Sequence, residues 1–99
     1  LDDAISGISA LPAIVKAVEG KIPIMVDGGF RRGSDIVKAL ALGAKLCLIG
    51  RPHLWGVSVA GEAGVSHVID IYRQEMTRTM GLLGANSIAD IKPDMIIAP

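Results

Sequence analysis

Residues 22–33 read Ile-Pro-Ile-Met-Val-Asp-Gly-Gly-Phe-Arg-Arg-Gly, and this stretch decides the fold class. Its first five residues are apolar without alternation, which is typical of a strand buried on both faces in a parallel sheet. Pro23 is compatible with such a strand only near its first residue. A glycine-rich turn follows, and Ser34 is a suitable N-cap for a helix that ends near Gly43. The stretch therefore predicts a buried strand, a tight turn and a helix.

The same kinds of element continue on both sides of this stretch. A helix capped by Ser9 precedes it and ends at Gly20, and residues 45–49 form a second apolar run that predicts another buried strand. An apolar stripe over residues 61–83 predicts a long amphipathic helix that ends at the following glycine. The order helix, strand, helix, strand, helix is that of a parallel α/β sheet. Two parallel strands do not make a stable sheet, so we expect the chain to be an incomplete part of a single domain.

The composition argues against some partners. The 99 residues carry ten basic and ten acidic side chains, so there is no global electrostatic reason to expect nucleic acid or an anionic membrane as a partner. Apolar residues make up 51%, but no apolar run approaches the roughly 20 residues of a membrane-spanning helix, so we assign the excess to a core. The one cysteine, Cys47, lies in an apolar run and is expected to be a buried, reduced thiol. Leu1-Asp2-Asp3 shows no leader pattern and reads as the interior of a longer chain.

Glycine and arginine follow both predicted strands. The carboxyl ends of parallel strands meet at one edge of a sheet, where TIM barrels often hold a phosphate group. Glycine allows backbone amides to approach an anion, a helix start supplies further amides, and arginine adds a charged planar donor. We therefore predict one phosphate site built from Asp27, Gly28, Gly29, Phe30, Arg31, Gly50 and Arg51. The alternative is that the glycines only make a tight turn and the arginines are solvated.

Asp27 does not fit a bare phosphate, because its carboxylate would repel the anion. Its position at the strand end suggests a hydrogen bond to a neutral part of the ligand, such as a polyol hydroxyl. Two alternatives stay open, namely that Asp27 accepts from amides of the turn or that it pairs with Arg31. Arg32 is expected to be exposed or to lie between subunits.

Residues 22–44, 49–52, 54–56 and 61–65 together resemble the FMN-dependent 2-hydroxy acid dehydrogenase family, which includes glycolate oxidase, lactate oxidase, flavin-type lactate dehydrogenase and mandelate dehydrogenase. The resemblance covers essentially the whole of residues 1–99. It implies the C-terminal part of a TIM (β/α)8 barrel, from helix 6 through strand 7, helix 7 and strand 8 to helix 8. A shorter match around Asp-Gly-Gly also occurs in inosine monophosphate dehydrogenases and flavin-type isopentenyl diphosphate isomerases, but the later stretches favour the hydroxy acid family.

The resemblance implies FMN as the cofactor. Residues 27–31 would form the first FMN-binding segment, with Phe30 contributing through its backbone, and Gly50 with Arg51 would form the second. The complete flavoprotein would be an oxidoreductase that converts a small 2-hydroxy acid to the 2-oxo acid. Its expected partners are the remainder of the barrel and further copies of itself in a homotetramer, and no metal ligand is implied.

The same resemblance implies that the catalytic residues lie outside this chain. In the family, the catalytic histidine and the substrate arginine lie in a segment directly followed by Leu-Asp, which Leu1-Asp2 matches. His53 and His67 are expected to be ordinary surface histidines, so this segment alone should be inactive. The acid and the electron acceptor stay open, and the expected location is cytoplasmic, with the peroxisome or a peripheral membrane attachment as alternatives. The alternative functions are a segment of another phosphate-binding barrel, either one like inosine monophosphate dehydrogenase that binds a nucleotide monophosphate or a flavin-type isomerase, and a non-catalytic, self-associating barrel fragment.

Overall fold

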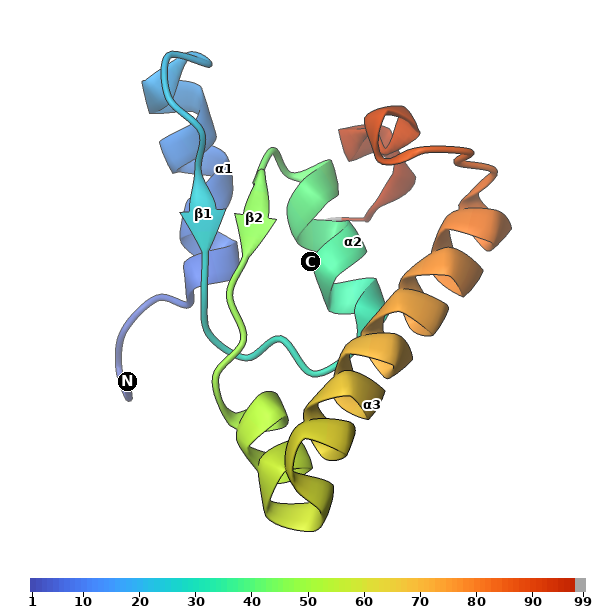
Figure 1. Ribbon diagram of the computed structural model, residues 1–99. Helices are drawn as coiled ribbons and strands as arrows, with labels where there is room; N and C mark the ends of the chain where they lie inside the picture. Colours follow the sequence, from blue (N-terminus) through green and yellow to red (C-terminus); the bar gives the residue numbers. More distant parts are fainter. Residues whose placement is uncertain (98–99) are drawn as a thin grey trace.

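The computed structural model describes residues 1–97 and contains the predicted order of helices and strands (Figure 1). The elements are α1 (Gly7–Val18), β1 (Met25–Val26), α2 (Gly33–Ala41), β2 (Leu46–Cys47) and α3 (Arg51–Leu83), followed by the short 3-10 helices η1 (Ile88–Asp90) and η2 (Pro93–Met95). The predicted α/β class with two parallel strands is therefore confirmed.

The two strands pair in parallel, with Met25 opposite Leu46 and Val26 opposite Cys47. Backbone hydrogen bonds just outside the ladder extend the pairing, from the Lys45 amide to the Ile24 carbonyl and from the Leu48 amide to the Val26 carbonyl. The strands are nevertheless shorter than the two five-residue runs that we predicted. Each strand has one neighbour within residues 1–97, and a two-stranded sheet is only marginally stable.

Two apolar clusters hold the elements together. The first joins α1, β1 and α2, and the second joins α2 to the end of α3 and to the segment that follows it. The fully or nearly buried members of the first cluster are Leu11, Val26, Phe30, Ala39 and Ala44, and those of the second are Val37, Ala41, Ala85 and Ile91. Met76 and Met80 of α3 pack against the second cluster. Helix α2 therefore contributes side chains to both clusters.

Other apolar side chains of the sheet remain uncovered. Met25 is 60% exposed, Leu46 is 57% exposed and Leu48 is 50% exposed, although all three lie in or beside the strands. Cys47 was predicted to be buried, and this prediction is wrong for the described chain, because the thiol is only half-buried. Even this partial burial raises the pKa of the Cys47 thiol. The sheet thus has an apolar surface for which residues 1–97 provide no cover.

The caps of the first two helices differ from those we predicted. Ser6, not Ser9, precedes α1, and its hydroxyl oxygen accepts from the Ser9 amide at 3.2 Å. Ser34 lies inside α2, and the N-cap position belongs to Arg32. The start of α2 is held by Asp35, whose carboxylate accepts from the Arg32 amide at 2.9 Å. A carboxylate near a helix start is also favoured by the helix dipole, which explains why it takes this role.

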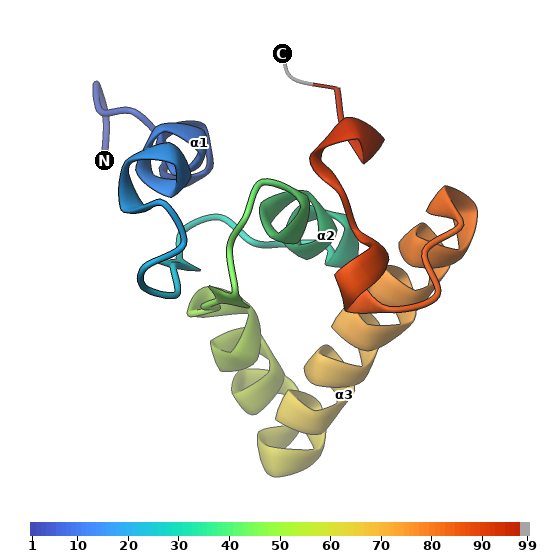
Figure 2. The same cartoon turned by 90° about the horizontal axis from the view of Figure 1, so that it is seen from above.

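The last helix begins ten residues earlier than predicted, at Arg51 rather than Gly61. Its backbone breaks at Ala60 and Gly61, and the two arms form the V that is visible in Figures 1 and 2. The arms touch where Gly56 faces Gly64, since a Cβ on Gly64 would overlap the Gly56 carbonyl oxygen. The longer arm then runs beside α2 (Figure 2). None of the helices within residues 1–97 is long and apolar enough to span a membrane.

Candidate anion-binding site

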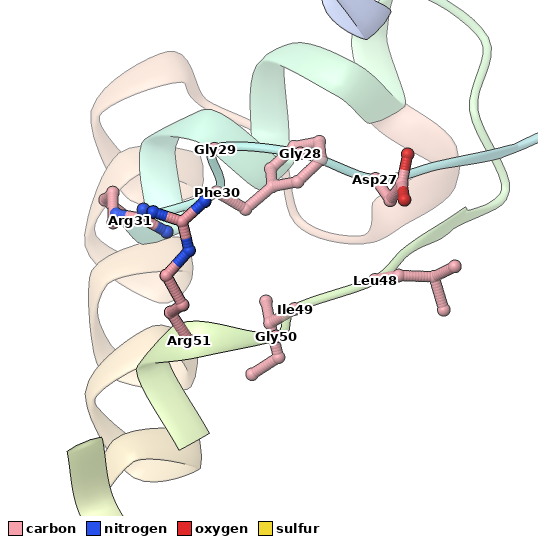
Figure 3. A pocket seen from close by; sticks show the side chains of 9 residues that line it. All are labelled: Asp27, Gly28, Gly29, Phe30, Arg31, Leu48, Ile49, Gly50 and Arg51. Carbon is pink, nitrogen blue, oxygen red and sulfur yellow. The ribbon is translucent and has the colours of Figure 1, made fainter. Parts of the chain in front are cut away.

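A cavity of about 260 Å³ lies where β1 and β2 end (Figure 3). It is lined by Asp27, Gly28, Gly29, Phe30, Arg31, Leu48, Ile49, Gly50 and Arg51. All seven residues that the sequence predicted for a phosphate site are among them. The loop after β1 and the strand end after β2 therefore converge on one space, as expected for parallel strands.

The loop after β1 turns sharply because of two glycines. Gly28 has a φ of 93° and Gly29 has a φ of 82°, a backbone conformation that other residues adopt only with strain. A Cβ at either position would meet nothing within 4 Å, so it is the backbone conformation that requires glycine here. The amides of Gly29 and Phe30 donate to no acceptor within residues 1–97, so they are available to a ligand in the cavity.

Positive charge reaches the cavity from both strand ends. Arg51 is the first residue of α3, and its guanidinium extends toward the backbone of the β1–α2 loop (Figure 3). Arg31 lines the same cavity, and its guanidinium carbon lies 5.0 Å from the centre of the Trp55 ring, which is a cation–π contact. The first amides of α3 have no partners inside the helix. These groups together make the cavity suitable for an anion such as a phosphate.

Asp27 also lines the cavity, and its carboxylate is exposed. We considered that it accepts from turn amides, but Asp35 takes that role for Arg31 and Arg32, with distances of 3.0 and 2.9 Å. Within residues 1–97 Asp27 forms no ion pair with Arg31 either. Its carboxylate is thus able to accept a hydrogen bond from a hydroxyl group of a ligand.

Two side chains of α3 hold the loop in place from behind, and sequence reasoning did not assign them this role. The Tyr72 hydroxyl donates to the Phe30 carbonyl at 2.6 Å in a buried hydrogen bond. Glu75 accepts from the Gly33 amide at 2.8 Å and from the Arg32 Nε at 3.0 Å. Tyr72 and Glu75 are three residues apart and so lie on one face of α3, a spacing that could have indicated a shared target.

The charges of the Arg32–Glu75 pair stabilise each other. The Arg32 side chain lowers the pKa of the Glu75 carboxyl, with a further contribution from the Gly33 amide, and Glu75 raises the pKa of Arg32. Arg32 was expected to be exposed or to lie between subunits, and its side chain is indeed 68% exposed, but it is paired with Glu75 and does not line the cavity.

Neither histidine lines the cavity. His53 lies in the first turn of α3, and His67 is exposed on its longer arm. The residues around the cavity supply backbone donors, two guanidinium groups and one carboxylate. This set can bind a ligand that carries an anionic group close to a hydroxyl group. The lining residues include no cysteine, serine or histidine that could act as a nucleophile or base.

Comparison with known proteins identifies the family. The model of the FMN-dependent dehydrogenases matches residues 1–98, and the chain therefore belongs to this family. An L-lactate oxidase from Nostoc sp. is 55% identical over 91 residues, which are 92% of this chain and 25% of that protein. A 2-hydroxyacid oxidase 2 from Rattus norvegicus is 50% identical over 96 residues, covering 97% of this chain and 27% of the relative.

Two further similarities extend the range of relatives. A pre-mycofactocin synthase from Mycolicibacterium smegmatis is 46% identical over 99 residues, which are 100% of this chain and 25% of that protein. A solved structure of an oxidised, active mutant of (S)-mandelate dehydrogenase aligns with a TM-score of 0.89 and 43% identity, covering 96% of this chain and 26% of that one. The chain thus spans about a quarter of the length of these relatives.

Proposed function

We propose that residues 1–99 are the C-terminal part of an FMN-binding (β/α)8 barrel, in which β1 and β2 are strands 7 and 8 and α1, α2 and α3 are helices 6, 7 and 8. The open apolar surface around Met25, Leu46 and Leu48 supports this proposal, because the interior of a barrel is filled by such side chains from neighbouring strands. The likeness to mandelate dehydrogenase over 96% of the chain supports it as well.

In this barrel the cavity holds the 5′-phosphate of FMN, and the observation that carries the proposal is the convergence of both strand ends on that one space. The amides of Gly29, Phe30 and the start of α3 donate to the phosphate oxygens, and Arg51 adds a charge-assisted hydrogen bond. Asp27 accepts from a hydroxyl of the ribityl chain. When bound, FMN supplies the two-electron acceptor of the reaction. The role of this segment is to fix how deeply the flavin sits.

The complete protein oxidises a small 2-hydroxy acid, with its catalytic histidine and substrate arginine just before Leu1. The names of the lactate oxidase and 2-hydroxyacid oxidase relatives support this substrate class. A relative named for a different activity, the pre-mycofactocin synthase, is still 46% identical over the segment, which fits a segment that leaves the choice of substrate to other residues. Assembly as a homotetramer and a cytoplasmic location belong to the same proposal.

The test is the affinity of the full-length protein for FMN, measured by the quenching of flavin fluorescence. Replacing Arg51 with methionine should weaken FMN binding by about 1.5–3 kcal/mol, the scale of a hydrogen bond to a charged group. Arg73→Met is the matched control, because Arg73 is also on α3 but pairs with Asp70 and does not line the cavity.

Two results would count against the proposal. Equal FMN affinity of Arg51→Met and the unchanged protein would remove Arg51 from the site. A purified full-length protein without flavin absorbance, which also fails to take up added FMN, would favour a barrel that binds a nucleotide monophosphate instead.

A further inference from the structure

The loop that leads from β1 into α2 is anchored to the longer arm of α3 at two points. Tyr72 holds the Phe30 carbonyl at 2.6 Å, and Glu75 holds the Gly33 amide at 2.8 Å. The first contact joins residues 42 positions apart, is buried and bonds a hydroxyl to a backbone group that would otherwise lack a partner. Between the two anchors lies Arg31, which lines the cavity.

These contacts fix the orientation of one peptide group. A trans peptide is planar, so its carbonyl and its amide point in opposite directions. In the peptide between Phe30 and Arg31, the carbonyl faces Tyr72 and the amide faces the carboxylate of Asp35, at 2.6 and 3.0 Å. With both ends engaged, the carbonyl oxygen is kept away from the cavity. If this peptide turned over, its carbonyl oxygen would face the carboxylate of Asp35, and both hydrogen bonds would be lost.

The second anchor decides which arginine faces the cavity. Glu75 binds the Arg32 Nε with both carboxylate oxygens, at 3.0 and 3.1 Å, and thereby keeps this guanidinium against α3. Arg31, the preceding residue, lines the cavity and packs over Trp55, whereas Arg32 does not line it. Gly33 allows the close approach that this arrangement needs, because a Cβ there would lie 2.5 Å from the Met76 amide nitrogen.

We propose that Tyr72 and Glu75 are positioning residues of the phosphate site: from behind the loop, they keep the Phe30 carbonyl out of the cavity and present Arg31 to the ligand. This inference rests on the proposed function, since the ligand is the phosphate group of FMN. It leads to a specific expectation. Loss of either anchor weakens the binding of ligands that carry the phosphate and leaves unchanged the binding of a flavin without it.

The experiment compares FMN with riboflavin, which lacks the phosphate, in titrations of the full-length apoprotein. Tyr72→Phe removes only the hydroxyl group and keeps the buried ring. We expect FMN to bind about five- to tenfold more weakly to this variant, the effect of one lost hydrogen bond, with riboflavin affinity unchanged. Glu75→Gln should act in the same direction. Asp70→Asn is its matched control, because it removes the same charge from α3 at a residue that pairs with Arg73 and does not line the cavity.

The possible results separate the inference from the function on which it rests. An equal loss of FMN and riboflavin affinity would mean that Tyr72 and Glu75 have a general role in folding. Unchanged affinities in both variants would mean that they have no role in binding. Either result overturns the inference. If Tyr72→Phe does not fold, Glu75→Gln decides alone. If the unchanged protein binds FMN no more tightly than riboflavin, the phosphate site itself is wrong, and the proposed function falls with the inference.

Discussion

The two walls of the cavity are built in different ways. The loop of residues 27–33 is held by side chains on two helices, with Asp35, Tyr72 and Glu75 bonding its backbone. The strand end of residues 48–51 has no such support within the described chain, and it consists of a short extended segment that runs straight into α3. One wall is thus formed before a ligand arrives, whereas the other contributes an open helix start and the charge of Arg51.

This difference predicts where substitutions will act. A change in the anchored loop disturbs contacts that are part of the fold, so its effect should appear in stability as well as in binding. A change in the open strand end removes charge or backbone donors that have no other partner, so its effect should appear mainly in binding. Arg51→Met, with its expected loss of FMN affinity, belongs to the second kind.

The largest effect on stability is expected at Gly33. An alanine there would place its Cβ 2.5 Å from the Met76 amide nitrogen and 2.6 Å from the Glu75 Cβ, so α2 and α3 would have to separate. We expect Gly33→Ala to lower the free energy of unfolding of the full-length protein by about 1–3 kcal/mol, as overpacking does. Urea unfolding followed by circular dichroism measures this change.

Gly50→Ala is the matched substitution in the other wall. A Cβ at Gly50 would meet nothing within 4 Å, and its φ of −121° is on the side that all residues adopt. Its effect on unfolding should therefore be clearly smaller than that of Gly33→Ala. If both alanine substitutions lowered the free energy of unfolding equally, the loop of residues 27–33 would not be more tightly held than the strand end of residues 48–51.

A smaller effect is expected from Trp55, which connects the two walls. It lies in the first arm of α3, and its ring supports the guanidinium of Arg31 at 5.0 Å. Trp55→Leu should weaken FMN binding by about 0.5–1 kcal/mol, the scale of an exposed cation–π contact. Trp55→Phe keeps an aromatic face and should retain most of the affinity. If the leucine and phenylalanine variants bind FMN equally, the ring does not position Arg31.

Sequence reasoning found the parts of this molecule that depend on local signals. The apolar runs, the glycines at 28 and 29 and the arginines at 31 and 51 are readable because strand burial, positive φ and anion binding each select particular residue types at particular spacings. The first arm of α3 was missed because Pro52 and Gly56 are typical of a loop, and the close contact with Gly64 that explains a glycine at position 56 is visible only in the structure.

The anchors of the loop could not be read in the same way. The spacing of Tyr72 and Glu75 places them on one face of α3, but nothing near either residue in the sequence indicates which partner, 42 or 43 positions away, this face contacts. The cap of α2 was assigned to Ser34 because hydroxyl residues favour that position, yet it is the carboxylate of Asp35 that accepts from the amides of both Arg31 and Arg32. Tertiary contacts and the local cap geometry, not residue type alone, decided these roles.

The smallest expected effect concerns pH and tests whether Glu75 anchors the loop as an ion. Its pKa is lowered from 4.5, first by the Arg32 side chain, then by the Gly33 amide and, more weakly, by Arg78. A carboxyl whose pKa is lower in the folded state stabilises the fold fully above its unfolded value, and this contribution disappears as the pH falls through the folded value. The stability difference between the unchanged protein and Glu75→Gln should therefore be constant near neutral pH and shrink below pH 4.5.

Thermal unfolding of both proteins across this range provides the measurement, and all other carboxyls cancel because both proteins contain them. A difference that does not change with pH would mean that Glu75 holds the loop without its charge.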